Sequence, residues 1–142
     1  MWTLETFKVL ESIGERLGFR SRYKGKREFL WDFVWLEMND EVESFGQLFL
    51  AAESEWTHRN VVDDFNKLLV TAAPLRLMIF QAQYRDMYKE KLEDLKSRSY
   101  RFKNNPGFFI VACWIYGEEK KEVMFNTWNT FLSEISNKKL ES

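Results

Sequence analysis

The fold of this chain is decided by residues 48–56, which read LFLAAESEW. An apolar run followed by two carboxylates two positions apart predicts a buried strand that ends in an acidic pair. Because alternate side chains of a strand point to one face, Glu53 and Glu55 are expected to project the same way. Like charges this close repel each other, so the pair predicts a positive partner, and Mg²⁺ prefers hard oxygen ligands of this kind.

A second strand-like run lies upstream at residues 29–35, which read FLWDFVW and carry one acid, Asp32, among six apolar residues. Residues 37–44 between the two runs are acidic and polar and predict a hairpin loop, with Asn39 and Asp40 in its turn. The two strands are therefore expected to be antiparallel neighbours. That arrangement would bring Asp32 toward Glu53 and Glu55 and predicts a cation site built from carboxylates.

Composition limits the classes of protein to which this chain can belong. Its 142 residues, 45% hydrophobic and 30% charged, are typical of one globular domain spanning 1–142. A net charge of −1 excludes a general polycation, so any nucleic-acid contact is expected from a local basic patch. A single cysteine, Cys113, and the lack of a signal peptide or a membrane-length apolar stretch predict a reducing, cytoplasmic location and no membrane contact.

Hydrophobic periodicity predicts an alternation of helices and strands along the rest of the chain. A stripe that includes Leu4, Phe7 and Leu10 predicts a helix over 3–17, with Gly18 as its stop. The remaining predicted elements are helices at 58–73, 84–98 and 129–137, and strands at 75–80, 108–115 and 122–128. Because a helix precedes the strand at 75–80, the pattern predicts a crossover to a parallel neighbour there, and the order of elements predicts the α/β class.

The densest positive run, residues 20–27, reads RSRYKGKR and immediately precedes the strand that carries Asp32. It is therefore expected to lie at the rim of any site formed there. Lysine and arginine contact phosphates through charge and hydrogen bonding, so this run predicts a nucleic-acid contact. A solvated loop without a ligand is the alternative. The five basic residues are Arg20, Arg22, Lys24, Lys26 and Arg27.

The order of Asp32 on one strand and Glu53-Ser54-Glu55 on the next resembles the PD-(D/E)xK nuclease superfamily, in its Glu-x-Glu variant. The chain departs from the usual motif at Glu55, where most of the family has Lys. The resemblance covers roughly residues 2–115, and the order of predicted elements agrees with it. It implies a restriction endonuclease-like core, in which helices flank a central mixed sheet of four to five strands.

The resemblance also implies an activity, the hydrolysis of phosphodiester bonds in DNA by a metal-dependent endonuclease. Its implied catalytic residues are Asp32, Glu53 and Glu55, with Glu55 orienting or deprotonating the attacking water. Mg²⁺, or Mn²⁺ in its place, would be held by Asp32, Glu53 and the main-chain carbonyl of Ser54. Because no separate recognition domain is visible in the sequence, a homodimer or a specificity-giving protein partner is expected.

Two accessory positions follow from the same resemblance. The first helix of such nucleases can supply an extra acid, which here would be Glu11 or Glu15. Some members carry the catalytic lysine on the helix after the motif, where this chain has Lys67. Helical angles place Lys67 opposite the apolar stripe of its own helix, so its side chain is expected to point to solvent.

Two alternatives to an active nuclease remain open at the level of sequence. The first is a catalytically inactive fold of the same type that acts as a nucleic-acid- or protein-binding subunit, which the missing motif lysine favours. The second is a protein unrelated to nucleases that binds another protein through an aromatic-rich surface, since aromatic residues make up 17% of the chain.

Overall fold

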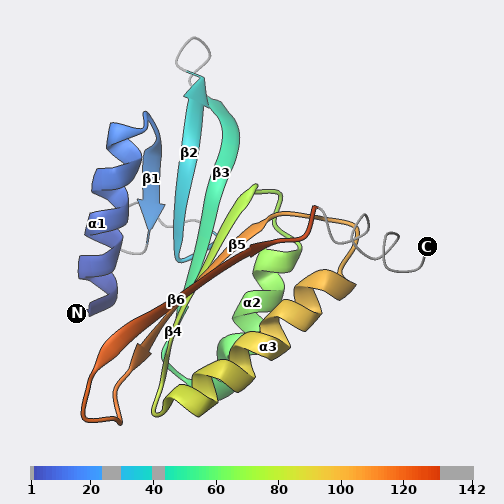
Figure 1. The fold of residues 1–142 in the computed structure, drawn as a ribbon. Helices are drawn as coiled ribbons and strands as arrows, with labels where there is room; N and C mark the ends of the chain where they lie inside the picture. Colours follow the sequence, from blue (N-terminus) through green and yellow to red (C-terminus); the bar gives the residue numbers. More distant parts are fainter. Residues whose placement is uncertain (1, 24–29, 40–43, 132–142) are drawn as a thin grey trace.

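The computed structural model describes residues 2–23, 30–39 and 44–131, which form one mixed β-sheet with helices on both faces (Figure 1). The described part has six strands in the spatial order β1-β2-β3-β4-β5-β6. The α/β class and the mixed sheet are confirmed, whereas four to five strands had been predicted. The elements are α1 (Trp2–Arg16), β1 (Arg20–Tyr23), β2 (Phe33–Asn39), β3 (Ser44–Glu55), the 3₁₀ helix η1 (His58–Asn60), α2 (Val61–Leu69), β4 (Leu75–Ala82), α3 (Arg85–Arg101), β5 (Phe108–Ile115) and β6 (Glu122–Asn129).

Sequence order and spatial order coincide because each connection joins neighbouring strands. β1, β2 and β3 form an antiparallel meander, and β6 returns antiparallel beside β5. β3, β4 and β5 are parallel, since α2 and then α3 carry the chain back to the start of the next strand. The predicted antiparallel pairing of β2 with β3 and the predicted crossover to β4 are therefore confirmed.

The two faces of the sheet pack against different helices. One face carries side chains such as Val34 and Ala51 and packs against α2 and α3 through residues that include Phe65 and Leu95. The other face packs against α1, where Phe7 is its buried contact. Figure 1 shows α1 apart from the α2–α3 pair. The face on which a side chain lies therefore decides which helix it can meet.

Helix α1 has the predicted position but buries less of its stripe than a core helix would. Phe7 is buried, whereas Leu4, Ile13 and Leu17 are 46%, 43% and 60% exposed. The helix ends as predicted at Gly18, whose φ of +86° favours glycine, and the Phe19 N–H donates to the Gly14 carbonyl at 2.8 Å.

Three local predictions require correction. The strand predicted at 29–35 begins at Phe33, so Asp32 immediately precedes β2. The basic run, for which no strand was predicted, begins with β1, because Ser21 and Tyr23 alternate with its arginines and are buried. A 3₁₀ turn at His58–Asn60 delays α2 to Val61.

Other predictions lie wholly or partly outside the described residues. The first is the hairpin loop predicted at 37–44: Glu37 to Asn39 belong instead to β2 and Ser44 to β3, and residues 40–43 lie outside the described part. The second is the helix predicted at 129–137, of which Asn129 belongs to β6. No helix in the described ranges is long and apolar enough to cross a membrane.

Candidate functional site

Asp32 and Glu53 lie side by side at the β2–β3 pair, as the sequence predicts. The antiparallel register pairs Phe33 with Ala52, which brings Asp32 to the level of Glu53. The carboxylate of Asp32 is fixed there, because its Oδ2 accepts a hydrogen bond from the Ser54 main-chain N–H at 2.9 Å. The hairpin thus brings together two acids that lie 21 positions apart in the sequence.

Glu53 is a buried acid, with only 1% of its surface exposed. It shares a sheet face with Ala51, which packs in the core beneath α2. Its Oε1 atom is buried and has no hydrogen-bond partner in the described structure. Burial and then the charge of Asp32 raise the pKa of Glu53 to about 9. In the absence of a cation, this carboxyl therefore holds a proton at neutral pH.

Helix α2 supplies a positive charge to the acid pair through Lys67. Its Nζ lies 3.9 Å from Glu53 Oε2 and 3.0 Å from Asp64 Oδ1, one helical turn earlier. The Lys67 side chain is 55% exposed, so its ammonium group lies near the buried acid and is also open to solvent. Lys67 lowers the pKa of Glu53, opposing burial and Asp32, while its own pKa is raised chiefly by the hydrogen bond to Asp64.

The prediction that Lys67 points away from the site is therefore wrong for its ammonium group. Helical angles describe where a side chain leaves the backbone, but the flexible four-carbon stem of lysine can carry the charge back along the helix surface. Asp64 was not among the predicted site residues, although its spacing of three residues from Lys67 makes the two neighbours on one helix surface.

Glu55 lies at the end of β3 and does not complete a three-carboxylate set. Its Oε1 accepts a hydrogen bond from the Thr57 main-chain N–H at 2.7 Å, which fixes the chain as it leaves the strand. Among the residues with described positions, no group of three or more His, Cys, Asp or Glu side chains is arranged to hold a metal ion. Of the three predicted acids, Asp32 and Glu53 are the two that the described structure brings to one level of the β2–β3 pair.

The other predicted site residues divide between the two sheet faces. Glu11 and Glu15 lie on α1, which packs on the face opposite Glu53, so neither joins the acid pair. Arg22 is paired with Val34, and residues paired across a ladder share a face, so Arg22 lies on the face of Asp32 and Glu53. Arg20, paired with Leu36, lies on the same face. Lys24, Lys26 and Arg27 fall outside the described residues.

Taken together, the site consists of two adjacent carboxylates, one of them buried, beneath an ammonium group that reaches solvent. Comparisons with protein-family models, curated proteins and solved structures found no match for this chain.

Proposed function

We propose that this chain is a metal-dependent nuclease that hydrolyses phosphodiester bonds in DNA, built on a restriction endonuclease-like core. The observation that carries the proposal is the acid pair Asp32 and Glu53 with the ammonium group of Lys67 3.9 Å from Glu53. Two acids and one lysine on neighbouring strands and the following helix are the combination that the resemblance to PD-(D/E)xK nucleases implies.

The residues present fit a divalent cation. A buried carboxylate oxygen without a hydrogen-bond partner, Glu53 Oε1, is unfavourable unless something positive or a proton satisfies it. Burial, and after it the charge of Asp32, raises the pKa of Glu53, and a cation beside the carboxylate would offset both effects. Mg²⁺ in such sites is often held by only one or two carboxylates, with waters and substrate phosphates as its other ligands. When bound, it lowers the pKa of its water and stabilises charge on phosphate.

In this proposal Asp32 and Glu53 hold the cation, and the Ser54 N–H keeps Asp32 in position. Lys67 takes the role that the family usually gives to the motif lysine, since its half-exposed side chain can meet a phosphate oxygen or the attacking water. Glu55, for which sequence analysis proposed that role, instead orients the end of β3 through Thr57.

The basic residues on the same sheet face favour a phosphate-containing polymer as substrate. Arg22 and Arg20 lie on strand β1, two strands from Glu53 and on its side of the sheet. Arginine binds phosphate through both charge and paired hydrogen bonds. The side of the sheet that carries the acids therefore also carries cations suited to a nucleic-acid backbone.

The proposal is tested by incubating the purified protein with supercoiled, linear and single-stranded DNA in Mg²⁺, Mn²⁺ or EDTA. Glu53→Gln keeps the size of the buried side chain, and Glu93→Gln, on the exposed surface of α3, is its matched control. We expect metal-dependent cleavage that falls at least about 100-fold in Glu53→Gln and is unchanged in Glu93→Gln, because a catalytic metal contributes several kcal/mol.

A binding subunit without catalytic activity is the second candidate. It is favoured by one observation, that Lys67 already pairs with Asp64 at 3.0 Å and so is partly neutralised. This candidate requires DNA binding that is insensitive to EDTA and no cleavage with either metal. Absence of both cleavage and DNA binding would reject both candidates.

A further inference from the structure

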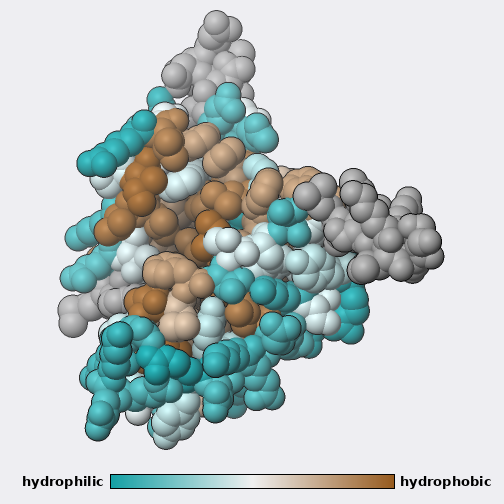
Figure 2. Space-filling view, in the orientation of Figure 1, coloured by the Kyte–Doolittle hydropathy of each residue, from teal (hydrophilic) through white to brown (hydrophobic). Residues whose placement is uncertain are grey.

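Two indole–threonine hydrogen bonds join distant parts of the chain, one on each face of the sheet. On the α1 face, where Figure 2 shows apolar surface gathered beside α1, Trp56 Nε1 donates to Thr3 Oγ1 at 2.7 Å. On the opposite face, Trp31 Nε1 donates to Thr71 Oγ1 at 2.9 Å. The second bond adjoins the acid pair, because Trp31 immediately precedes Asp32.

The hydroxyl of Thr71 makes a further hydrogen bond, to the helix that carries Lys67. It donates to the Lys67 carbonyl at 2.6 Å while it accepts from Trp31, which is possible because a hydroxyl has one donor and two acceptor positions. Thr71 is only 2% exposed, so water does not compete for either bond. One buried oxygen atom therefore connects the turn of Lys67 with the residue before Asp32.

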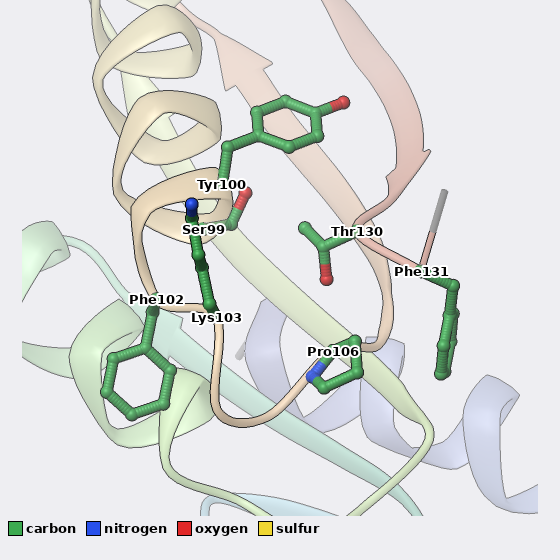
Figure 3. A pocket seen from close by; sticks show the side chains of 7 residues that line it. All are labelled: Ser99, Tyr100, Phe102, Lys103, Pro106, Thr130 and Phe131. Carbon is green, nitrogen blue, oxygen red and sulfur yellow. The ribbon is translucent and has the colours of Figure 1, made fainter. Parts of the chain in front are cut away.

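Thr71 is itself fixed, because the chain after α2 is bound to the turn after α3. Lys67 lies in the last turn of α2, whose final carbonyls have no donor within the helix. Asn105 Nδ2 donates to the Leu69 carbonyl at 2.8 Å and to the Thr71 carbonyl at 2.7 Å. Asn105 immediately precedes Pro106, which Figure 3 shows in the turn between α3 and β5. The end of α2 is thus held by directional bonds to its neighbours.

The position of the Lys67 ammonium group depends on where this helix end lies. Its ion pair with Asp64 at 3.0 Å joins two residues of the same helix, so it fixes the ammonium relative to α2 and not relative to the sheet. The 3.9 Å between Lys67 Nζ and Glu53 Oε2 is a distance from α2 to β3, across which a flexible lysine stem has many rotamers. The hydrogen bonds of Thr71 tie α2 to the segment of Asp32 and so limit this distance.

We propose that Thr71 is a positioning residue of the candidate site, which holds the turn of Lys67 in place relative to Asp32 through the indole of Trp31. This role rests on the proposed function, in which Lys67 meets a phosphate oxygen or the attacking water. In this role Thr71 contacts neither of them and acts only through Lys67. Because a displacement of about 1 Å at a reacting group can slow a reaction about 100-fold, loss of the Thr71 hydroxyl is expected to slow cleavage.

Two substitutions of Thr71 test this role in DNA cleavage with Mg²⁺. Thr71→Val keeps the shape of the side chain without its hydroxyl, whereas Thr71→Ser keeps the hydroxyl. At saturating DNA, Thr71→Val should cleave more slowly by a factor between about 10 and the about 100-fold expected for Lys67→Ala, while Thr71→Ser cleaves as wild type. DNA affinity in EDTA should be unchanged in both variants. Equal cleavage rates in Thr71→Val and wild type would overturn the proposal.

Trp31→Phe separates positioning from helix capping, because it leaves the capping bond of Thr71 intact and removes only the indole donor. It should slow cleavage as Thr71→Val does, and the double variant should be no slower than Thr71→Val alone, since both remove one connection. Trp56→Phe, which removes the matched bond to Thr3, is the control and should cleave as wild type. Slow cleavage by Thr71→Val beside a wild-type rate in Trp31→Phe would make Thr71 a helix cap only and would contradict the proposal.

A measurement without DNA distinguishes failure of this role from failure of the proposed function. In EDTA, NMR relaxation of the Lys67 side-chain methylene next to the ammonium group reports, as an order parameter, how tightly that end is held. The order parameter should fall in Thr71→Val and Trp31→Phe and stay unchanged in Thr71→Ser and Trp56→Phe. If wild type cleaves no DNA but these changes occur, the proposed function fails and the positioning of Lys67 stands, whereas unchanged order parameters would overturn it. Should Thr71→Val not fold, Trp31→Phe decides both outcomes, since that side chain is only partly buried.

Discussion

Asp32 lies beside Glu53 because Phe33 pairs with Ala52 in the antiparallel β2–β3 ladder, and the Ser54 N–H holds the Asp32 carboxylate at 2.9 Å. One residue of register shift would move the two acids to opposite faces of the sheet. The site therefore depends on the hairpin register, and its properties follow from the pairing of these two carboxyls.

The first prediction concerns the stability of the metal-free protein as a function of pH. The pKa of Glu53 is raised from 4.5 to about 9, so the folded protein keeps a proton that the unfolded chain releases above pH 4.5. The free energy of unfolding should therefore fall as pH rises from 5 to 9, by up to about 1.4 kcal/mol per pH unit from this group. Urea denaturation in EDTA should show this slope in wild type and a smaller one in Glu53→Gln. Parallel curves would contradict the raised pKa.

The second prediction concerns the proton balance of metal binding. Because Glu53 is protonated below pH 9 and a ligand carboxyl must be ionised, Mg²⁺ binding should release about one proton near pH 7.5. Affinity should then rise by about tenfold per pH unit over this range. Calorimetry in two buffers of different ionisation enthalpy measures the released proton directly. Glu93→Gln should behave as wild type, and Mg²⁺ affinity independent of pH would contradict the assignment.

The third prediction assigns a role to Lys67. Lys67→Ala should reduce cleavage by about 100-fold, the effect typical of losing a group that assists proton transfer or binds the reacting phosphate. Because Lys67 lowers the pKa of Glu53, the same variant should shift the pH dependence of Mg²⁺ binding to higher pH. Lys89→Ala, on the exposed surface of α3, is the control. A lysine that only stabilises α2 would leave the pH profile unmoved.

The fourth prediction separates Lys67 from Glu55. Since Glu55 Oε1 accepts from the Thr57 N–H, Glu55→Gln retains that acceptor and should keep most of the cleavage rate. Glu55→Ala should lose about 1 kcal/mol of stability, as expected for one hydrogen bond, which thermal denaturation would detect. Loss of cleavage in Glu55→Gln with an unchanged melting temperature would restore Glu55 to the catalytic role predicted from sequence.

The fifth prediction concerns substrate binding through β1. In EDTA, where no cleavage can occur, Arg22→Ala should weaken DNA binding and reduce the slope of log affinity against log salt by about one. Fluorescence anisotropy at several salt concentrations provides both values. Lys103→Ala, in the turn after α3, removes an exposed charge elsewhere and should leave the slope unchanged. Equal effects of the two variants would indicate a general effect of net charge.

The sequence by itself determined most of the fold, because its signals are local. Alternation and apolar runs are read from neighbouring residues, and they located β3, β4, β5 and β6 and the three helices to within a few positions. The hairpin between β2 and β3 also follows from local polarity, and it was sufficient to place Asp32 beside Glu53. β1 was missed because its alternating residues are four in number and interleaved with arginines.

Only the tertiary structure decided how the site is completed. Burial of Glu53 depends on α2 packing over β3, and the reach of Lys67 depends on the path of a flexible side chain across that helix. The hydrogen bond that Glu55 accepts from the Thr57 N–H depends on how the chain turns after β3. The exclusion of Glu11 depends on which sheet face α1 covers. All of these are contacts between different elements, and the hydrophobic periodicity within a single helix or strand does not predict such contacts.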